Sequence, residues 1–240
     1  MLQLCRYDSP AAWSDAVVAL WRDRLAVNPR LRMCLPAGRT PQPIYAGIAA
    51  AVAARRCSFA AAEILLLDEY GGLAPDDPRR CAQMLRRDLL THIDLPPRQF
   101  VSLDPDAADL DAMCGDVERH IAAGGLQLTL LGIGLNGHVG LNEPGSRADS
   151  RTRRVHLEPA TVQAAAGYSG YGSVPSWGVT LGIATLAESA EIWLLACGVA
   201  KADIVGRLMH APAGSDLPAT WLRDHPNCRL FVDASAAAAL

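Results

Sequence analysis

The chain has 240 residues and a mass of 25.5 kDa, with 50% hydrophobic residues, 20% charged residues and a formal net charge of −3. These values exclude a disordered tail and a coiled coil, and they argue against a nucleic-acid partner. No apolar run reaches the roughly 18 residues that span a bilayer, and the N-terminus lacks a signal-peptide pattern, so we expect a cytoplasmic protein with no membrane partner. Seven scattered cysteines without a C-x-x-C pair predict free thiols rather than a metal or redox site.

Helices are predicted to alternate with short apolar strands along the chain. The predicted helices cover residues 11–27, 44–54, 78–93, 107–122 and 200–210, and the predicted strands cover residues 32–35, 64–67, 100–103, 126–133, 179–183, 192–196 and 229–232. Strands that are apolar throughout are typical of a parallel sheet with helices on both faces. We therefore predict an α/β fold, with three α/β/α layers around a mostly parallel sheet, in one domain over residues 1–240. Residues 234–239 are expected to fray.

Three unusual loops follow predicted strands. The first is P-A-G-R-T-P (36–41), the second begins D-E-Y (68–70), and the third is the glycine-rich stretch 132–145. Ligands of parallel sheets bind outside the carboxyl ends of the strands. We therefore expect the three loops to lie along one rim and to form a site there.

Each loop carries residues suited to a chemical role. Gly38 and Thr40 precede a predicted helix, where backbone N–H groups bind anions; an ordinary turn with Thr40 as N-cap is the alternative. Asp68 follows an apolar strand, where burial raises the pKa of a carboxyl toward that of a general base; a turn cap is the alternative. In the third loop, His138 and Glu143 are close enough in sequence to pair as an acid–base unit.

The chain contains 21 arginines and a single lysine, Lys201. This lysine stands between a predicted strand and a predicted helix. An ammonium group near a helix N-terminus is a compact charge that suits a phosphate group. The alternative is an accident of an arginine-rich composition.

Four stretches of sequence, taken together, resemble a known family. They are L-P-A-G-R-T-P (35–41), L-D-E-Y-G-G-L (67–73), L-G-I-G-L-N-G-H-V-G-L-N-E-P-G (131–145), and V-P (174–175) followed by G-V-T-L-G (178–182). Their order and spacing resemble glucosamine-6-phosphate deaminases over nearly the whole chain. The resemblance implies the fold of those enzymes, of 6-phosphogluconolactonases, of ribose-5-phosphate isomerase and of CoA transferases. The residues after His138, V-G-L-N-E-P (139–144), favour the deaminases over the lactonases.

The resemblance implies an amino-sugar-phosphate deaminase/isomerase, an enzyme acting on C–N bonds that converts glucosamine 6-phosphate to fructose 6-phosphate and ammonia in amino-sugar catabolism. By similarity, Asp68 carries a proton between C2 and C1, His138 assists ring opening, and Glu143 holds His138. Asn136 orients the imidazole ring, at a position where some members have Asp. The resemblance implies no metal and no organic cofactor.

Other substrates and functions stay open. Cys81 and residues 177–181 are also similar to galactosamine-6-phosphate deaminase/isomerases, so that sugar is an alternative. A 6-phosphogluconolactonase and a non-catalytic sugar-phosphate sensor are weaker ones. The expected partner is a small amino-sugar phosphate, and both a monomer and a homo-oligomer are open.

Lys201 matches the phosphate-binding Lys of the family, and we expect Gly38, Arg39 and Thr40 to bind the substrate phosphate with it. An Arg that the family commonly has for this purpose is absent from residues 161–168. Arg39 stands where the family usually has a small residue. It either supplies the missing cation or points to solvent.

Overall fold

The computed structural model describes residues 2–163 and 175–240. Its main sheet has seven parallel strands in the order β1-β10-β9-β6-β2-β3-β5. From one edge to the other these are β1 (Gln3–Tyr7), β10 (Cys228–Asp233), β9 (Ile192–Ala196), β6 (Leu128–Gly132), β2 (Arg32–Leu35), β3 (Glu63–Leu66) and β5 (Phe100–Val101). A mostly parallel sheet was predicted, and the structure confirms it.

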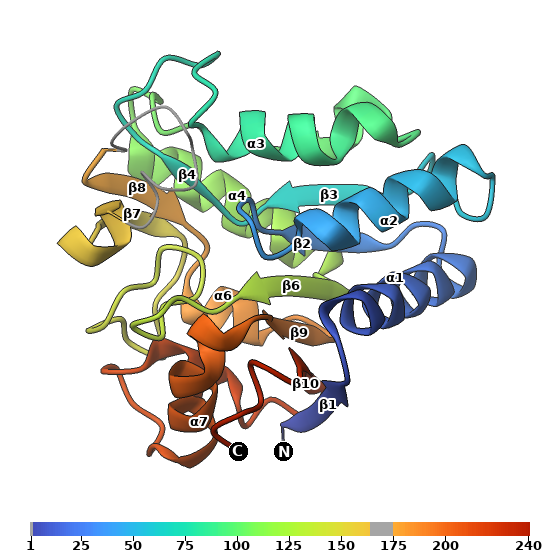
Figure 1. Ribbon diagram of the computed structural model, residues 1–240. Helices are drawn as coiled ribbons and strands as arrows, with labels where there is room; N and C mark the ends of the chain where they lie inside the picture. The colour runs from blue at the N-terminus through green and yellow to red at the C-terminus, as the bar shows by residue number, and fades with distance from the viewer. Residues whose placement is uncertain (1, 164–174) are drawn as a thin grey trace.

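Helices cover both faces of this sheet (Figure 1). One face packs against α1 (Pro10–Val27), α2 (Gln42–Ala53) and α3 (Cys81–Asp88), and the other packs against α4 (Leu110–Gly124), α6 (Ile183–Ala187) and α7 (Ala202–His210). Side chains alternate along each strand. Met33 and Leu35 therefore join the first core, while Cys34 joins the second. The predicted three-layer α/β/α fold is confirmed.

The strand order reverses at the centre of the sheet. After β2 the chain moves outward to β3 and β5, and it then returns to β6 on the other side of β2 before continuing to β9 and β10. The loops that leave β2 and β6 consequently separate in opposite directions. In open α/β sheets this reversal creates a crevice at the carboxyl ends of the strands, and ligands bind in it.

A second, antiparallel sheet lies beyond the carboxyl ends of β3 and β6 (Figure 1). Its strands are β4 (Asp68–Tyr70), β8 (Trp177–Thr180) and β7 (Arg153–His156), in the order β4-β8-β7. Leu67 joins β3 to β4, and its N–H and carbonyl bond to Leu35 and Leu181, at 3.0 Å each. The two sheets therefore meet directly before Asp68.

The prediction for residues 179–183 was wrong. The strand in this region is β8, it belongs to the antiparallel sheet, and Ile183 already begins α6. The apolar run resembles a buried parallel strand because β8 is itself almost fully buried. The strands β1, β4 and β7 were not predicted from the sequence. Exposed residues interrupt β1 and β7, and β4 is only three residues long.

Two further boundaries differ from the prediction. The helix expected over residues 78–93 is α3, which ends at Asp88 and is followed by a 3-10 turn, Leu90–His92. The C-terminal segment does not fray, since Ala236 and Ala237 are buried in the second core.

One domain over residues 1–240 stays a prediction. All seven cysteines are free thiols, as expected. Within residues 2–163 and 175–240, no helix has the length and apolar character needed to cross a membrane.

Glu118 of α4 ties the small sheet to the main body of the protein. Its carboxylate accepts hydrogen bonds from the Thr152 N–H at 2.8 Å, from the Thr152 hydroxyl, and from the Thr185 hydroxyl at 2.6 Å. Thr152 directly precedes β7, and Thr185 lies in α6. Both threonines are buried, so removing the shared acceptor leaves donors without a partner.

We expect Glu118→Ala to lower the free energy of unfolding by about 2–3 kcal/mol, because several buried donors lose their acceptor together. Urea unfolding is the measurement. Glu188→Ala is the matched control, since it removes an exposed carboxylate that pairs with Arg151, and such pairs contribute less than about 1 kcal/mol. Equal, small losses in both variants would show that Glu118 does not hold the two parts together.

Candidate active site

The three predicted loops meet at the reversal point of the main sheet. Two adjoining cavities, of about 460 and 440 Å³, share Asp68, Gly134, His138 and Gly140 in their walls. The first extends over the loop after β2 and reaches Lys201. The second extends toward the start of α3. The three loops therefore lie along one rim, as expected.

Asp68 lies at the centre of this site. Its side chain is 7% exposed and lines both cavities. Burial raises the pKa of Asp68 from 3.8 to about 7; a hydrogen bond from Cys81 lowers it, and the nearby charge of Glu69 raises it. A carboxyl with a pKa near 7 is present in both protonation states at neutral pH, which is the property that a proton carrier needs.

The third loop approaches Asp68 closely at Gly140. Its φ is +57°, and a Cβ at this position would lie 2.8 Å from Oγ1 of Thr180 and 3.3 Å from Oδ2 of Asp68. A larger residue would thus be strained and would push against the carboxylate. Gly134 has a similar role toward His138, because a Cβ there would lie 2.3 Å from ring atoms of the imidazole. These glycines let the loop hold the imidazole and carboxylate in one cavity.

His138, Asn136 and Glu143 form a hydrogen-bonded chain. The Nδ1 atom of His138 lies 2.7 Å from Oδ1 of Asn136, and Nδ2 of Asn136 donates to Oε2 of Glu143 at 2.8 Å. The direct distance from His138 Nδ1 to Glu143 Oε2 is longer, 3.6 Å. The expected pairing of His138 with Glu143 is therefore present, but Asn136 makes the shorter contact and bridges the two side chains.

This chain determines the tautomer of His138. The ionised carboxylate of Glu143 can only accept, so Asn136 must turn its NH₂ group toward it and its carbonyl oxygen toward the imidazole. Nδ1 of His138 then carries the proton that it donates to this oxygen. In the neutral ring, Nε2 is left as the basic atom.

The surroundings of Glu143 keep it ionised. Burial raises its pKa, but hydrogen bonds from His138, Thr161 and Asn136, together with the charge of His138, outweigh this effect, and the net pKa is lowered. Glu143 lines neither of the two cavities, whereas Asn136 and His138 do. Glu143 therefore acts through its neighbours.

The other end of the site is suited to an anion. Lys201 lies in a short turn, Val199–Lys201, directly before α7, and its Nζ donates to the carbonyl of Ile133 at 2.6 Å. Burial lowers the pKa of Lys201. Among the residues that the structure describes, no carboxylate pairs with Lys201, so the cavity presents a half-buried ammonium group.

The loop after β2 forms the facing wall of the same cavity. Gly38, Arg39 and Thr40 all line it. Gly38 has a φ of +108°, which favours glycine. Thr40 is not the N-cap of α2, as the alternative reading had it, because the helix begins at Gln42 with Pro41 before it and no side-chain cap. Thr40 is thus left beside the cavity without a capping role.

Some residues of the site were not singled out by their sequence motifs. Met84, Thr161 and Arg79 line the second cavity, and so does Cys81, which had entered only through a resemblance. Cys81 and Met84 belong to a helix whose sequence carries no recognisable motif, and proximity to Asp68 appears only when α3 is placed. In the part of the chain that the structure describes, no group of three or more His, Cys, Asp or Glu side chains could hold a metal ion.

The open parallel sheet carries a buried carboxyl, an imidazole and an ammonium group at its reversal point. This is the arrangement of an α/β enzyme acting on small anionic molecules. The family described as glucosamine-6-phosphate isomerases/6-phosphogluconolactonase matches residues 8–230, and the chain belongs to this family.

Several relatives resemble the chain over most of its length. The glucosamine-6-phosphate deaminase of Rhodopirellula baltica is 37% identical over 91% of this chain and 88% of its own length, and that of Shouchella clausii is 35% identical over 93% and 92%. A monomeric glucosamine-6-phosphate deaminase has a TM-score of 0.94 at 31% identity, over 100% of both chains. The 6-phosphogluconolactonase of Thermotoga maritima, at 20% identity and a TM-score of 0.77 over 97% of this chain and 100% of its own, shares the fold.

The burial of Asp68 has a consequence for stability. Because its pKa is raised on folding, the folded state holds a proton between about pH 4 and pH 7 that the unfolded state has released, so this carboxyl makes stability fall as the pH rises through that window. Above pH 7 the cost is at most about 4 kcal/mol. We expect Asp68→Asn to be more stable than the parent protein at pH 8, with a difference that shrinks at pH 5.

Thermal or urea unfolding of both proteins at the two pH values measures this difference. Asp116→Asn, at an exposed position of α4, is the control and should show little pH-dependent gain. A gain in Asp68→Asn that is the same at pH 5 and pH 8 would contradict a raised pKa for this group.

Proposed function

We propose that this protein is a glucosamine-6-phosphate deaminase, which converts glucosamine 6-phosphate to fructose 6-phosphate and ammonia. The observation that carries the proposal is a buried carboxyl with a pKa of about 7, in one site with an oriented imidazole and a half-buried ammonium group. The activity named for the relatives at 33–41% identity supports it. The related lactonase structures are about 20% identical and support the fold alone.

In this proposal, the phosphate binds between Lys201 and the loop that contains Gly38 and Thr40. The ammonium group and the backbone N–H groups of the loop neutralise the phosphate charge. Arg39 lines the same cavity and is a further candidate for this contact. Anchoring the phosphate at this end places the sugar carbons beside Asp68 and His138.

His138 assists ring opening. Its basic Nε2 atom takes the proton of the C1 hydroxyl and passes it to the ring oxygen O5 as the C1–O5 bond breaks and C1 becomes an aldehyde. Asn136 holds the imidazole in the tautomer that leaves Nε2 basic. Glu143 stabilises the positive charge that develops when the imidazole takes up a proton. The product of this step is the open-chain aldehyde, with the amino group still on C2.

Asp68 then performs the isomerisation. Its carboxylate takes the proton from C2, and the electrons of that bond form the C1–C2 double bond of an enolamine. The aldehyde oxygen on C1 takes a proton from the ammonium group on C2. The same carboxyl returns the proton to C1, which leaves an imine at C2. Water adds to this imine, ammonia leaves, and the ketone of fructose 6-phosphate remains. A carboxyl with a pKa near 7 suits both halves of the transfer.

The proposal is tested by measuring the release of ammonia by the purified protein. Glucosamine 6-phosphate and galactosamine 6-phosphate are compared side by side. Turnover of the gluco sugar with formation of fructose 6-phosphate supports it. Faster release from the galacto sugar would reassign the substrate. Hydrolysis of 6-phosphogluconolactone without ammonia release from either amino sugar would assign the protein to the lactonases, and binding without turnover would identify a sensor.

We expect Asp68→Asn to lower kcat by at least about 10²-fold, because the amide cannot accept the C2 proton. Its affinity for an open-chain amino-hexitol 6-phosphate, which has no carbonyl and cannot react, should stay within a few-fold of the parent value. Steady-state kinetics and calorimetry give the two numbers. A variant that keeps near-normal kcat would remove Asp68 from the proposed role.

Lys201→Ala should act mainly on KM. A charge-assisted hydrogen bond contributes roughly 1.5–3 kcal/mol, or about 10- to 150-fold in binding. Lys201→Arg should also weaken binding, because a planar guanidinium does not reproduce a compact ammonium. Arg39→Ala tests the second cation, and its effect should add to that of Lys201→Ala if both contact the phosphate. If Lys201→Ala binds the sugar phosphate like the parent, the phosphate does not lie at this end of the site.

A further inference from the structure

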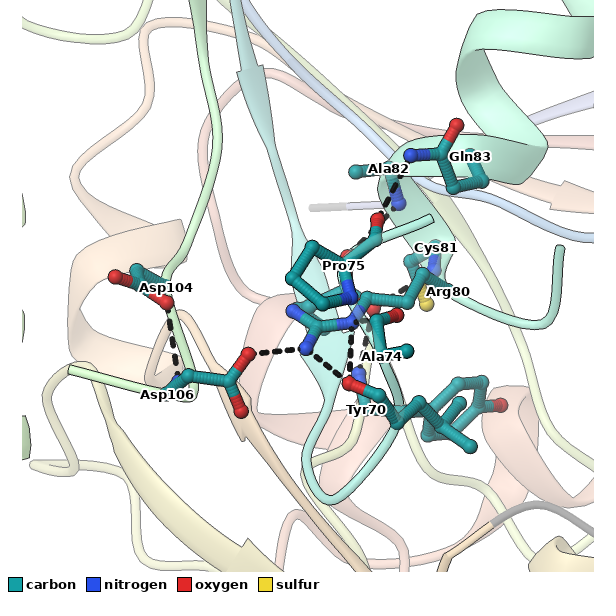
Figure 2. Close-up of polar contacts among 11 residues, drawn as sticks. Tyr70, Ala74, Pro75, Arg80, Cys81, Ala82, Gln83, Asp104 and Asp106 are labelled. Atoms are coloured by element: carbon teal, nitrogen blue, oxygen red, sulfur yellow. Dashed lines mark hydrogen bonds and ion pairs between the residues drawn. The ribbon is translucent and has the colours of Figure 1, made fainter. Parts of the chain in front are cut away.

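Two walls of the site begin at a backbone segment that a buried acid holds from a neighbouring strand. In the wall formed by α3, Glu69 of β4 accepts the N–H groups of Cys81 at 2.8 Å and of Ala82 at 2.9 Å, which are the first residues of the helix. Arg80, directly before the helix, adds a buried ion pair with Asp106 (Figure 2). The start of α3 is therefore anchored to the strand that carries Asp68.

The wall that carries Lys201 has an acid in the corresponding place, Asp233 at the end of β10. Its side chain is 1% exposed, and its Oδ1 atom accepts the N–H of Gly198 at 2.8 Å and that of Ala236 at 3.0 Å. β10 lies beside β9 in the main sheet, and Gly198 belongs to the turn that leaves β9. One carboxyl oxygen thus joins the turn after β9 to the segment after β10.

The turn held by Asp233 determines where Lys201 lies. Gly198 opens the turn with a φ of +90°, a conformation that favours glycine, and its carbonyl accepts the N–H of Lys201 at 3.0 Å. From there the ammonium group of Lys201 reaches the carbonyl of Ile133 at 2.6 Å. The position of the ammonium group in the cavity therefore depends on the position of Gly198.

The segment after β10 supports the helix that follows Lys201. Ala236, whose N–H binds Asp233, is buried in the same core as the apolar residues of α7. At Gly206 of α7, an added Cβ would lie only 3.2 Å from the Cβ and the carbonyl oxygen of Ala239. The helix thus packs closely on a segment whose first turn is closed by Asp233.

We propose that Asp233 is a positioning residue for the substrate phosphate: it binds the N–H of Gly198 and so fixes the turn that presents Lys201 to the phosphate. This inference rests on the proposed function, in which the phosphate binds between Lys201 and the loop after β2. Asp233 lines neither cavity, so it acts through the turn and does not touch the substrate.

The second carboxyl oxygen of Asp233 provides a conservative variant. Oδ2 is buried and has no hydrogen-bond partner in the part of the chain that the structure describes. In Asp233→Asn, the amide oxygen can accept both N–H groups, and the NH₂ group takes a place where no hydrogen bond is lost. This variant should preserve the turn. Asp233→Ala removes the acceptor and leaves both N–H groups without it.

The measurement is the contribution of the phosphate to binding. It is the ratio of the dissociation constants of an open-chain amino-hexitol and of its 6-phosphate, obtained by calorimetry, with competition for the weaker ligand. A displaced Lys201 lowers this ratio, whereas general damage to the site weakens both ligands and leaves the ratio unchanged. Glu118→Ala is the matched control, because it also removes a carboxyl that accepts a backbone N–H, at a position that lines neither cavity.

We expect Asp233→Ala to lower the ratio about 5- to 30-fold, which is part of what a charge-assisted contact to phosphate contributes. Asp233→Asn and Glu118→Ala should keep the parent ratio. Gly198→Ala should lower the ratio too, because its φ strains any residue with a Cβ, although no atom lies within 4 Å of the added carbon. Gly198→Ala also tests the turn if Asp233→Ala does not fold.

A double mutant shows whether Asp233 acts through Lys201. In the Lys201→Ala protein, Asp233→Ala should have no further effect on the ratio, because the group that it positions is absent. The proposal is overturned if Asp233→Ala keeps the parent ratio, or if the ratio falls equally with and without Lys201. An Asp233→Asn ratio as low as that of Asp233→Ala would contradict a role through these hydrogen bonds.

These binding measurements do not need turnover, so they separate the inference from the proposed function. If the parent binds the 6-phosphate more tightly than the amino-hexitol but releases no ammonia, the proposed function fails and the ratios still decide the role of Asp233. If the parent releases ammonia but the phosphate adds nothing to binding, the inference fails and the deaminase activity stands.

Discussion

The site depends on keeping the carboxyl group of Asp68 out of water, because burial is the largest influence on its pKa. Asp68 stands where β3 of the main sheet passes into β4 of the small sheet, and both sheets shield it. A nearby Arg or Lys would stabilise the carboxylate, but it would also lower the pKa out of the range in which the group can both take and return a proton. Burial, moderated by a neutral thiol, keeps the pKa near 7. The small antiparallel sheet, the close approach of Gly140 and the anchored start of α3 all serve this requirement.

The imidazole of His138 is held by a hydrogen-bonded chain through Asn136 to Glu143. An ionised Asp at position 136 would bring a second negative charge within about 3 Å of Glu143, and one of the two carboxyls would tend to hold a proton. With Asn136 in this place, the chain from Glu143 to His138 contains a single acid, and its charge is available to an imidazolium. The donor direction along the chain is then set by the amide, which cannot titrate. As long as Glu143 is ionised, this direction leaves Nε2 of His138 as the nitrogen that exchanges protons.

The sequence predicts the parallel layers well because β2, β6 and β9 are buried on both faces and read as continuous apolar runs. The polar residues that follow such strands were therefore placed correctly on one rim, including Asp68 and His138. The small sheet was missed because β7 contains two arginines and a histidine, whose side chains stay partly in solvent. Cys81 could not be assigned as a neighbour of Asp68 for another reason: its place depends on backbone hydrogen bonds to Glu69, and a side chain that caps a helix from a distant strand leaves no local pattern.

Lys201 and Asp68 reach the site from different parts of the main sheet, and this follows from the strand order. Lys201 reaches the cavity from the turn after β9, while Asp68 enters from β3, on the far side of β6 and β2. The reversal point thus lies between a cation that can hold a phosphate and a carboxyl whose pKa is set by burial, a thiol and another acid. Were the lysine to lie beside Asp68, it would bind the carboxylate and neither group would be available to a substrate. A sheet whose strand order reverses between them supplies this separation without any further element of structure.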